Sequence, residues 1–148
     1  MINLLKSNYL LSALTLFLLS PATQASTWFA LEAVESINGI TVEVDLESLR
    51  SLGEKRELMT RITFSQPQKE QDISYQSVIA ELEISCNSES DFWRSIRFFL
   101  GSSAEGKQLS SANFGASGLP RSVLMILPEK IWVTLQRSAC GRAATAAH

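Results

Sequence analysis

The sequence has few of the residues that carry catalytic or metal chemistry. It holds one histidine, His148, at the final position, and two cysteines, Cys86 and Cys140. A serine nucleophile needs a base held within hydrogen-bond reach, and nothing in the pattern around His148 fixes that side chain. Two thiolates without further ligands do not form a metal site. We therefore expect no metal, no cofactor and no histidine-assisted hydrolysis.

Motifs that bind phosphate or position a nucleophile are also missing. The chain has no phosphate-binding loop and no Cys-x-x-Cys pair. Residues 115–118 lack the glycine spacing of a nucleophile elbow and are better interpreted as a turn. Glu81 and Glu83, like Glu43 and Asp45, share one strand face by alternation, where solvated carboxylates are far commoner than catalytic ones. We predict that the protein is not an enzyme.

No apolar run is long enough to cross a membrane. The longest, Tyr9–Leu19, has about half of the roughly 20 residues that a spanning helix requires. Lys6 precedes it and the small-residue stretch Ala22–Ala25 follows, which is the pattern of a secretory signal peptide over residues 1–25. The alternative is a buried N-terminal helix of a cytosolic protein. We predict export to the periplasm or the outer cell surface, with no transmembrane segment after cleavage.

An excess of one charge is missing too. The chain carries 13 basic and 15 acidic residues, a net charge of −2, and loss of Lys6 with the signal peptide makes it one unit more negative. This balance argues against nucleic acid as a partner and against a polybasic membrane contact. The remaining residues, 26–148, have the length of one domain.

Both cysteines lie in the exported part of the chain. An oxidising compartment lets such a pair persist as a disulfide, so we predict a Cys86–Cys140 bridge. In the chain-entropy model, closing a loop of about 55 residues stabilises a fold by roughly 4 kcal/mol.

Alternation of apolar and polar residues dominates the mature chain. In residues 41–45, Val42 and Val44 share one face while Glu43 and Asp45 share the other, as in a half-buried antiparallel strand. We predict strands at residues 28–34, 41–45, 57–65, 74–86, 91–100 and 107–114, the first two forming a hairpin about Asn38-Gly39, and a further short apolar run at 122–127.

The connections have their own signals. Asp45 is placed to cap a short helical turn over residues 46–52, and Gly53 to end it. Pro67 is expected to end the third strand, because proline cannot donate to a strand ladder. Residues 66–72 and 115–120 have the composition of loops.

A helix is the better interpretation only near the end of the chain. Pro128 suits a first helical position, Glu129 and Arg137 complement the helix dipole, and Gly141 is a terminator. Cys140 falls at the far end of this helix, so the disulfide would tie it to the strand that Cys86 closes. The stripe expected to face the sheet contains Ile131, Leu135 and Ser138 or Ala139, with Trp132 and Gln136 adjacent.

Together these patterns predict an α+β fold. Its core is a single antiparallel β-sheet of about six strands, with a C-terminal helix packed on one face and tied by the disulfide. Residues 26–141 form the domain, and residues 142–148, which contain no large apolar side chain, are expected to be a disordered tail.

The order of these features resembles the surface-adhesin E family, small exported proteins of Gram-negative bacteria. Trp28 opens a strand, residues 44–50 read Val-Asp-Leu-Glu-Ser-Leu-Arg, Cys86 closes the long central strand, and a proline-started helix ends at Cys140. The resemblance implies a disulfide-tied sheet and helix and a non-enzymatic protein that binds host matrix, serum or envelope proteins. The mature chain begins without a lipid-attachment cysteine, and no binding residue is carried over from the family.

The alternation by itself indicates candidate binding residues. It places Trp93, Arg97 and Phe99 outward on one strand, with Arg94 nearby, and tryptophan and arginine are favoured interface anchors. Arg61 and Arg56 could extend this set. The alternative is that Trp93 and Phe99 complete a core on both faces of the sheet.

Three kinds of function follow, of which an unusual hydrolase is the least favoured by the motifs. The first is an exported, adhesin-like protein that binds a protein ligand. The alternative is a periplasmic inhibitor or chaperone-like module, whose mark would be a protruding loop. Each of these functions is compatible with a homodimer.

Overall fold

The structure is a computed structural model, and it describes residues 27–31, 39–88 and 90–141. The predicted signal peptide, the tail at 142–148 and Asn38 of the predicted hairpin turn lie outside these residues. None of the helices described is both long and apolar enough to pass through a bilayer.

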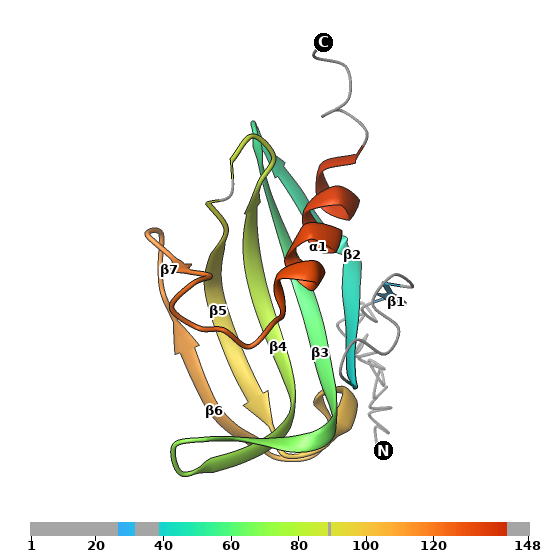
Figure 1. The fold of residues 1–148 in the computed structure, drawn as a ribbon, viewed down its shortest axis with the longest axis vertical. Coiled ribbons are helices and arrows are strands. Elements are labelled where there is room, and N and C mark those ends of the chain that lie inside the picture. The colour runs from blue at the N-terminus through green and yellow to red at the C-terminus, as the bar shows by residue number, and fades with distance from the viewer. Residues whose placement is uncertain (1–26, 32–38, 89, 142–148) are drawn as a thin grey trace, which may run out of the picture.

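Over the described residues, the fold is an antiparallel sheet followed by one α-helix (Figure 1). Six strands lie side by side in chain order from β1 to β6, each paired with its sequence neighbour, and the short β7 pairs with β5. The predicted fold class is confirmed. The elements are β1 Trp28–Ala30, β2 Ile40–Leu52, β3 Lys55–Glu70, β4 Ile73–Ser85, β5 Phe92–Phe99, the 3-10 helix η2 Ser102–Ala104, β6 Gln108–Asn113, β7 Leu119–Pro120 and α1 Glu129–Cys140.

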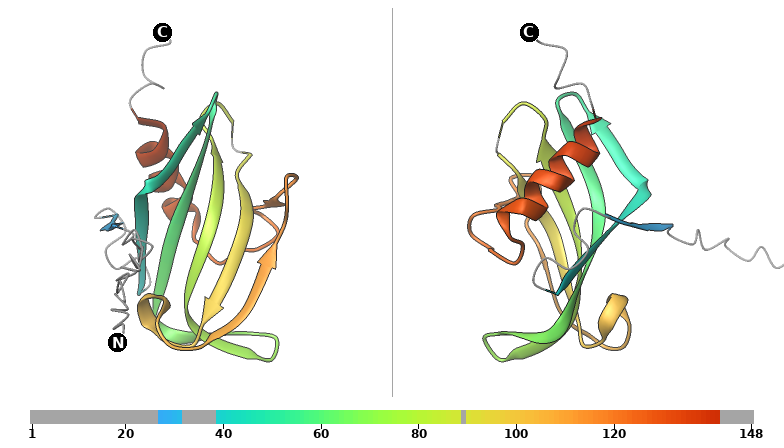
Figure 2. Two further views of the ribbon diagram at one scale, coloured as in Figure 1. Left: turned by 180° about the vertical axis from the view of Figure 1, so that it is seen from behind. Right: turned by 45° about the vertical axis from the view of Figure 1, so that its right-hand side comes forward.

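The core lies between the sheet and α1, which covers one face (Figure 2). Alternation in β4 places Val78, Ala80, Leu82 and Ile84 on that face, and all four are fully buried. The apolar stripe of α1 packs on them through Ile131, Trp132 and Leu135. We call the opposite face of the sheet the uncovered face.

The termini of α1 follow the sequence signals with a shift of one residue. Pro128 is the N-cap, and its carbonyl accepts bonds from the amides of Ile131 and Trp132 at 2.9 and 3.4 Å. Gly141 takes the C-cap with φ of 64°, a conformation that favours glycine. The Cys86–Cys140 disulfide is confirmed, with Cα atoms 5.5 Å apart.

The helical turn predicted after Asp45 is wrong, because β2 continues through residues 46–52. The pairing of β2 with β3 shifts between Asp45 and Arg50, so that this stretch bulges out of the ladder. Asp45 still accepts a bond from the amide of Glu47, and the Ser48 hydroxyl accepts the amide of Met59 that the bulge leaves unpaired. Pairing with β3 outweighs the local capping signal.

The strand end predicted at Pro67, and the loop at 66–72, are also wrong. β3 runs to Glu70, and its turn with β4 is only Gln71-Asp72. Pro67 lies where the β3–β4 register shifts between Thr63 and Gln68, beyond the last pairing with β2 at Phe64. The ladder is interrupted there, so the missing amide hydrogen costs little.

Candidate functional site

Trp93 does not lie outward as alternation predicts. Pairing between β4 and β5 passes from Glu81 opposite Ser95 to Leu82 opposite Trp93, so Arg94 is an extra residue in β5. This bulge turns the Trp93 side chain toward α1. Trp93 is 0% exposed and packs edge to face on Trp132, with ring centroids 5.2 Å apart. It is a core side chain.

Phe99 is on the uncovered face but is almost inaccessible, at 9% exposure. The 3-10 helix η2 crosses this end of the face: the amide of Ser103 bonds to the Thr63 hydroxyl at 3.2 Å, and that of Ala104 bonds to the Ser77 hydroxyl at 2.8 Å. Trp93 and Phe99 are thus both buried, as in the alternative of a two-sided core, but they lie on opposite faces of the sheet, whereas alternation places them on the same face.

Arg94 lies on the uncovered face within a charged cluster. Its guanidinium bonds to Glu83, lies 3.9 Å from a carboxylate oxygen of Glu57, and donates to the carbonyls of Gly115 and Ala116. Lys55 bonds to the other Glu83 oxygen at 2.8 Å. Arg94 is therefore occupied by contacts within the protein.

Glu83 is the centre of this cluster, and its predicted solvent exposure is wrong. The side chain is only 2% exposed. Burial by itself raises the pKa of the Glu83 carboxyl, but the hydrogen bonds and charges of Lys55 and Arg94 outweigh burial and hold that pKa below its usual value. The carboxylate is thus stabilised in its charged form, which is the opposite of a general acid held ready to donate a proton.

Arg97 is the predicted candidate that remains available. It is exposed, opposite Ile79 on β4 and Ser111 on β6. Among the residues that the structure describes, its side chain has no hydrogen bond, ion pair or ring contact. Ile79 beside it is half-buried, so an arginine that has no partner in the described ranges lies next to an apolar side chain.

The uncovered face also contains an ion pair of Arg61 with Glu43, of which the residue pattern indicated only Arg61. Arg61 forms two bonds to the Glu43 carboxylate, at 2.6 and 2.7 Å, and its guanidinium lies 4.7 Å from the centre of the Trp28 ring. Arg61 lies opposite Glu43 on one side and Ile79 on the other. The strand register alone could have indicated this pair, since Glu43 and Arg61 are cross-strand neighbours.

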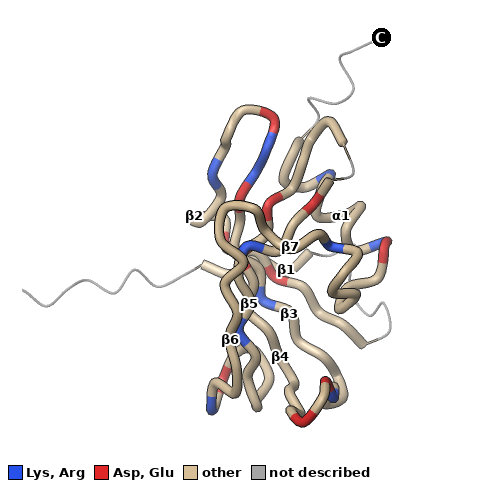
Figure 3. The backbone as a smooth tube through the Cα atoms, turned by 90° about the vertical axis from the view of Figure 1, so that its left-hand side faces the viewer, with Lys and Arg blue, Asp and Glu red and all other residues tan. Residues whose placement is uncertain are grey.

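The candidate site is the row across this face, which we call the arginine row. It is formed by side chains from the four adjacent strands β2 to β5. Lys, Arg, Asp and Glu residues are distributed along the backbone rather than gathered in one patch of a single sign (Figure 3). Within the described ranges, no three His, Cys, Asp or Glu side chains are grouped as a metal site. The arginine row consists of Glu43, Arg61, Ile79 and Arg97, with Trp28 over Arg61.

Comparison with known proteins gives one match. A family model described as surface-adhesin protein E matches residues 28–141, which span β1 to the end of α1. No curated protein and no solved structure matches the chain.

Proposed function

This chain belongs to the surface-adhesin protein E family, and from that premise we propose that it is an exported, non-enzymatic protein that binds a protein ligand at the cell envelope or host surface. The signal-peptide pattern of residues 1–25 supports export. The family supports a surface role. The proposed contact surface is the arginine row.

One observation carries the choice of surface: Arg97 is exposed and free of partners within the described residues, beside half-buried Ile79. Arginine is among the side chains that most often dominate binding energy, particularly next to an apolar surface from which a partner excludes water. Arg61 and Trp28 add a second, ordered contact in the same row. By contrast, Trp93 and Phe99 are buried and Arg94 is engaged, so these three serve the fold.

The experiment identifies the ligand first and then tests the surface. The mature protein is used to capture proteins from serum, extracellular matrix and envelope fractions, and each captured protein is purified. Biolayer interferometry with that ligand then compares Arg97→Ala with the parent. Loss of a central interface arginine is expected to weaken binding by about tenfold or more.

Arg137→Ala is the matched control, because Arg137 is an exposed arginine on α1 without side-chain partners in the described part of the chain. It should bind within about twofold of the parent. Equal losses in both variants would indicate a general charge effect and reject the arginine row. Labelling of intact cells tests the location: a protein inaccessible from outside would favour the periplasmic alternative.

A further inference from the structure

The helix side of the sheet is incompletely covered. α1 has 12 residues and is about 18 Å long at 1.5 Å per residue, whereas β3 has 16 residues and extends about 53 Å at 3.3 Å per residue. The irregular segment 121–128, which leads into α1, crosses the rest of this face (Figure 1). One pass of chain cannot fill the width of the sheet, so hollows remain beside it.

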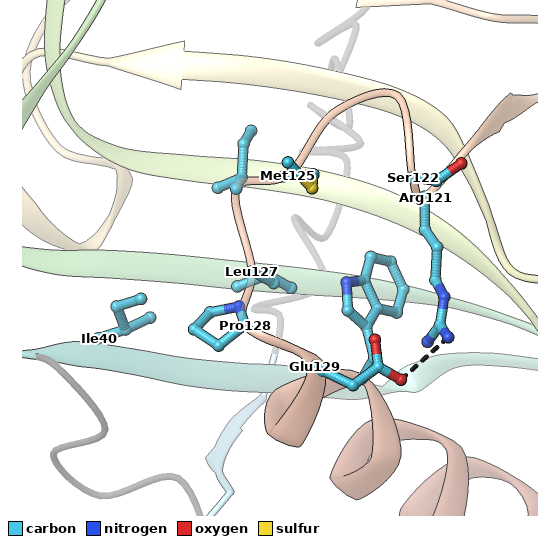
Figure 4. A pocket seen from close by; sticks show the side chains of 9 residues that line it. Ile40, Arg121, Ser122, Met125, Leu127, Pro128 and Glu129 are labelled. Atoms are coloured by element: carbon cyan, nitrogen blue, oxygen red, sulfur yellow. Dashed lines mark hydrogen bonds and ion pairs between the residues drawn. The ribbon is translucent and has the colours of Figure 1, made fainter.

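One of these hollows lies between segment 121–128 and the start of α1 (Figure 4). Its volume is about 490 Å³, within the roughly 300–1,000 Å³ typical of small-molecule sites. Arg121 and Glu129 lie at one end and Ile40 at the other. The lining between them is mostly apolar, from Met125, Ile126, Leu127, Pro128 and Trp132.

The walls of the hollow are fixed, but one side can adapt. Ile40, Leu127 and Trp132 are buried, and Trp132 is held by its edge-to-face contact with Trp93. Met125, in contrast, is 85% exposed. An unbranched methionine side chain can repack around ligands of different shape. A rigid apolar wall facing an adaptable methionine suits a flexible apolar chain.

The polar end can recognise an anion. The Arg121 guanidinium bonds to buried Asp91 at 3.3 Å and to Glu129 at 3.0 Å, and lies 5.7 Å from the centre of the Trp132 ring. Asp91 holds it in place, whereas Glu129 is 69% exposed. Exposed ion pairs contribute little stability, so an incoming carboxylate can replace Glu129 on Arg121 at small cost.

From this geometry we propose that the hollow, which we call the Arg121 pocket, binds a single-chain anionic amphiphile of the fatty-acid class. The acyl chain lies along Trp132, Leu127 and Ile40 under Met125, and the carboxylate bonds to Arg121. The volume exceeds that of any one protein side chain, while a medium-length acyl chain can fold to fill it. This ligand is independent of the protein ligand proposed above.

Calorimetric titration of the mature protein with sodium decanoate tests the proposal, below the concentration at which decanoate forms micelles. Decyltrimethylammonium is the matched probe with the same chain and the opposite charge. Decanoate should bind saturably and at least about tenfold more tightly, because only the anion gains from Arg121.

Three variants at exposed positions distinguish binding in the Arg121 pocket from a general effect of the protein's charge. Met125→Glu places a carboxylate over the hollow and should weaken decanoate binding about fivefold or more. Glu129→Gln removes the competing carboxylate and should strengthen it about threefold. Val123 lies in the same segment but outside the lining of this pocket, and its side chain is 65% exposed. The Val123→Glu variant should therefore bind decanoate within about twofold of the parent.

Circular dichroism confirms that each variant is folded. The proposal is overturned if decanoate does not bind saturably or if the two amphiphiles bind equally. It is also overturned if Met125→Glu and Val123→Glu cannot be distinguished. Weaker binding by Glu129→Gln would likewise contradict the assigned competition for Arg121.

Discussion

At the residue scale, the buried carboxylate of Glu83 shows how tertiary contacts change the meaning of a polar position. The same alternation that makes Glu81 a half-buried strand residue would leave Glu83 near solvent, yet Arg94, Lys55 and the turn at 115–116 enclose it. A buried charge is tolerated only when its partners are close and its hydrogen bonds are made. Glu83 satisfies both conditions, so its role is structural.

This arrangement makes stability depend on pH. Because the folded-state pKa of Glu83 is lowered, its contribution is fully present above the ordinary pKa of 4.5 and is lost as the pH falls through the lower folded-state pKa. Glu83→Gln should cost roughly 3 kcal/mol at pH 7, since Lys55 and Arg94 lose their counter-charge. The difference from the parent should shrink toward pH 3, as measured by urea unfolding.

Glu81→Gln is the control, because Glu81 is on the same strand face and has no ion pair in the described part of the chain. It should change the unfolding free energy by less than about 0.5 kcal/mol. If Glu83→Gln keeps the full acid dependence of the parent, Glu83 is not the group responsible.

At the scale of elements, α1 depends on the sheet for its stability. An isolated helix of 12 residues is marginal in water, so its order comes from packing and from its ties to neighbouring elements. Besides the apolar stripe, the Gln136 amide bonds to the carbonyls of Ser85 and Ser88 at 2.8 and 3.1 Å. Cys140 joins Cys86 just after β4, at the same end of the sheet.

Removing the disulfide should therefore weaken the whole domain. The bridge spans 54 positions, and the double variant Cys86→Ser/Cys140→Ser should lose about 2–4 kcal/mol, because the unfolded chain regains its freedom. The check is the guanidinium midpoint followed by tryptophan fluorescence, to which Trp93 and Trp132 contribute from the interface between sheet and helix. Gln136→Ala, which removes polar ties only, should cost about 1 kcal/mol. Equal stability of the double variant and the parent would contradict a stabilising role for the bridge.

At the scale of the whole molecule, one sheet presents two chemically different sides. The uncovered face carries the arginine row, whereas the helix side carries the core and the Arg121 pocket. Arg97 and Met125 therefore lie on opposite sides of the sheet, and no residue contacts both of them in the described part of the chain.

Independence of these two sides is the corresponding prediction. Arg97→Ala should leave decanoate affinity within about twofold of the parent, and Met125→Glu should leave affinity for the captured protein unchanged. In the double variant, the change in binding free energy for each ligand should equal the sum of the changes that the two single variants cause for that same ligand. Calorimetry measures this sum for decanoate, and interferometry measures it for the captured protein. A coupling above about 1 kcal/mol would show that the two ligands share a site or a conformational change.

Much of the architecture was readable from residues that act locally. The period of two across residues 74–86 predicted β4 and its inner face, and Pro128, Glu129 and Gly141 predicted α1 to within one residue. The disulfide followed from two cysteines in a chain predicted to be exported. These signals survive because each depends on neighbouring residues or on a single possible pairing.

Only the tertiary structure decided which residues of the candidate site are available. Alternation reports the face of a side chain only while the register is unbroken, and the extra residue Arg94 turns Trp93 from the surface into the core. Residues 46–52 became strand rather than helix, because β3 supplies partners that no local pattern contains. Burial of Glu83, exposure of Arg97 and the hollow beside Arg121 likewise depend on segments far apart in the chain, so no local pattern could predict them.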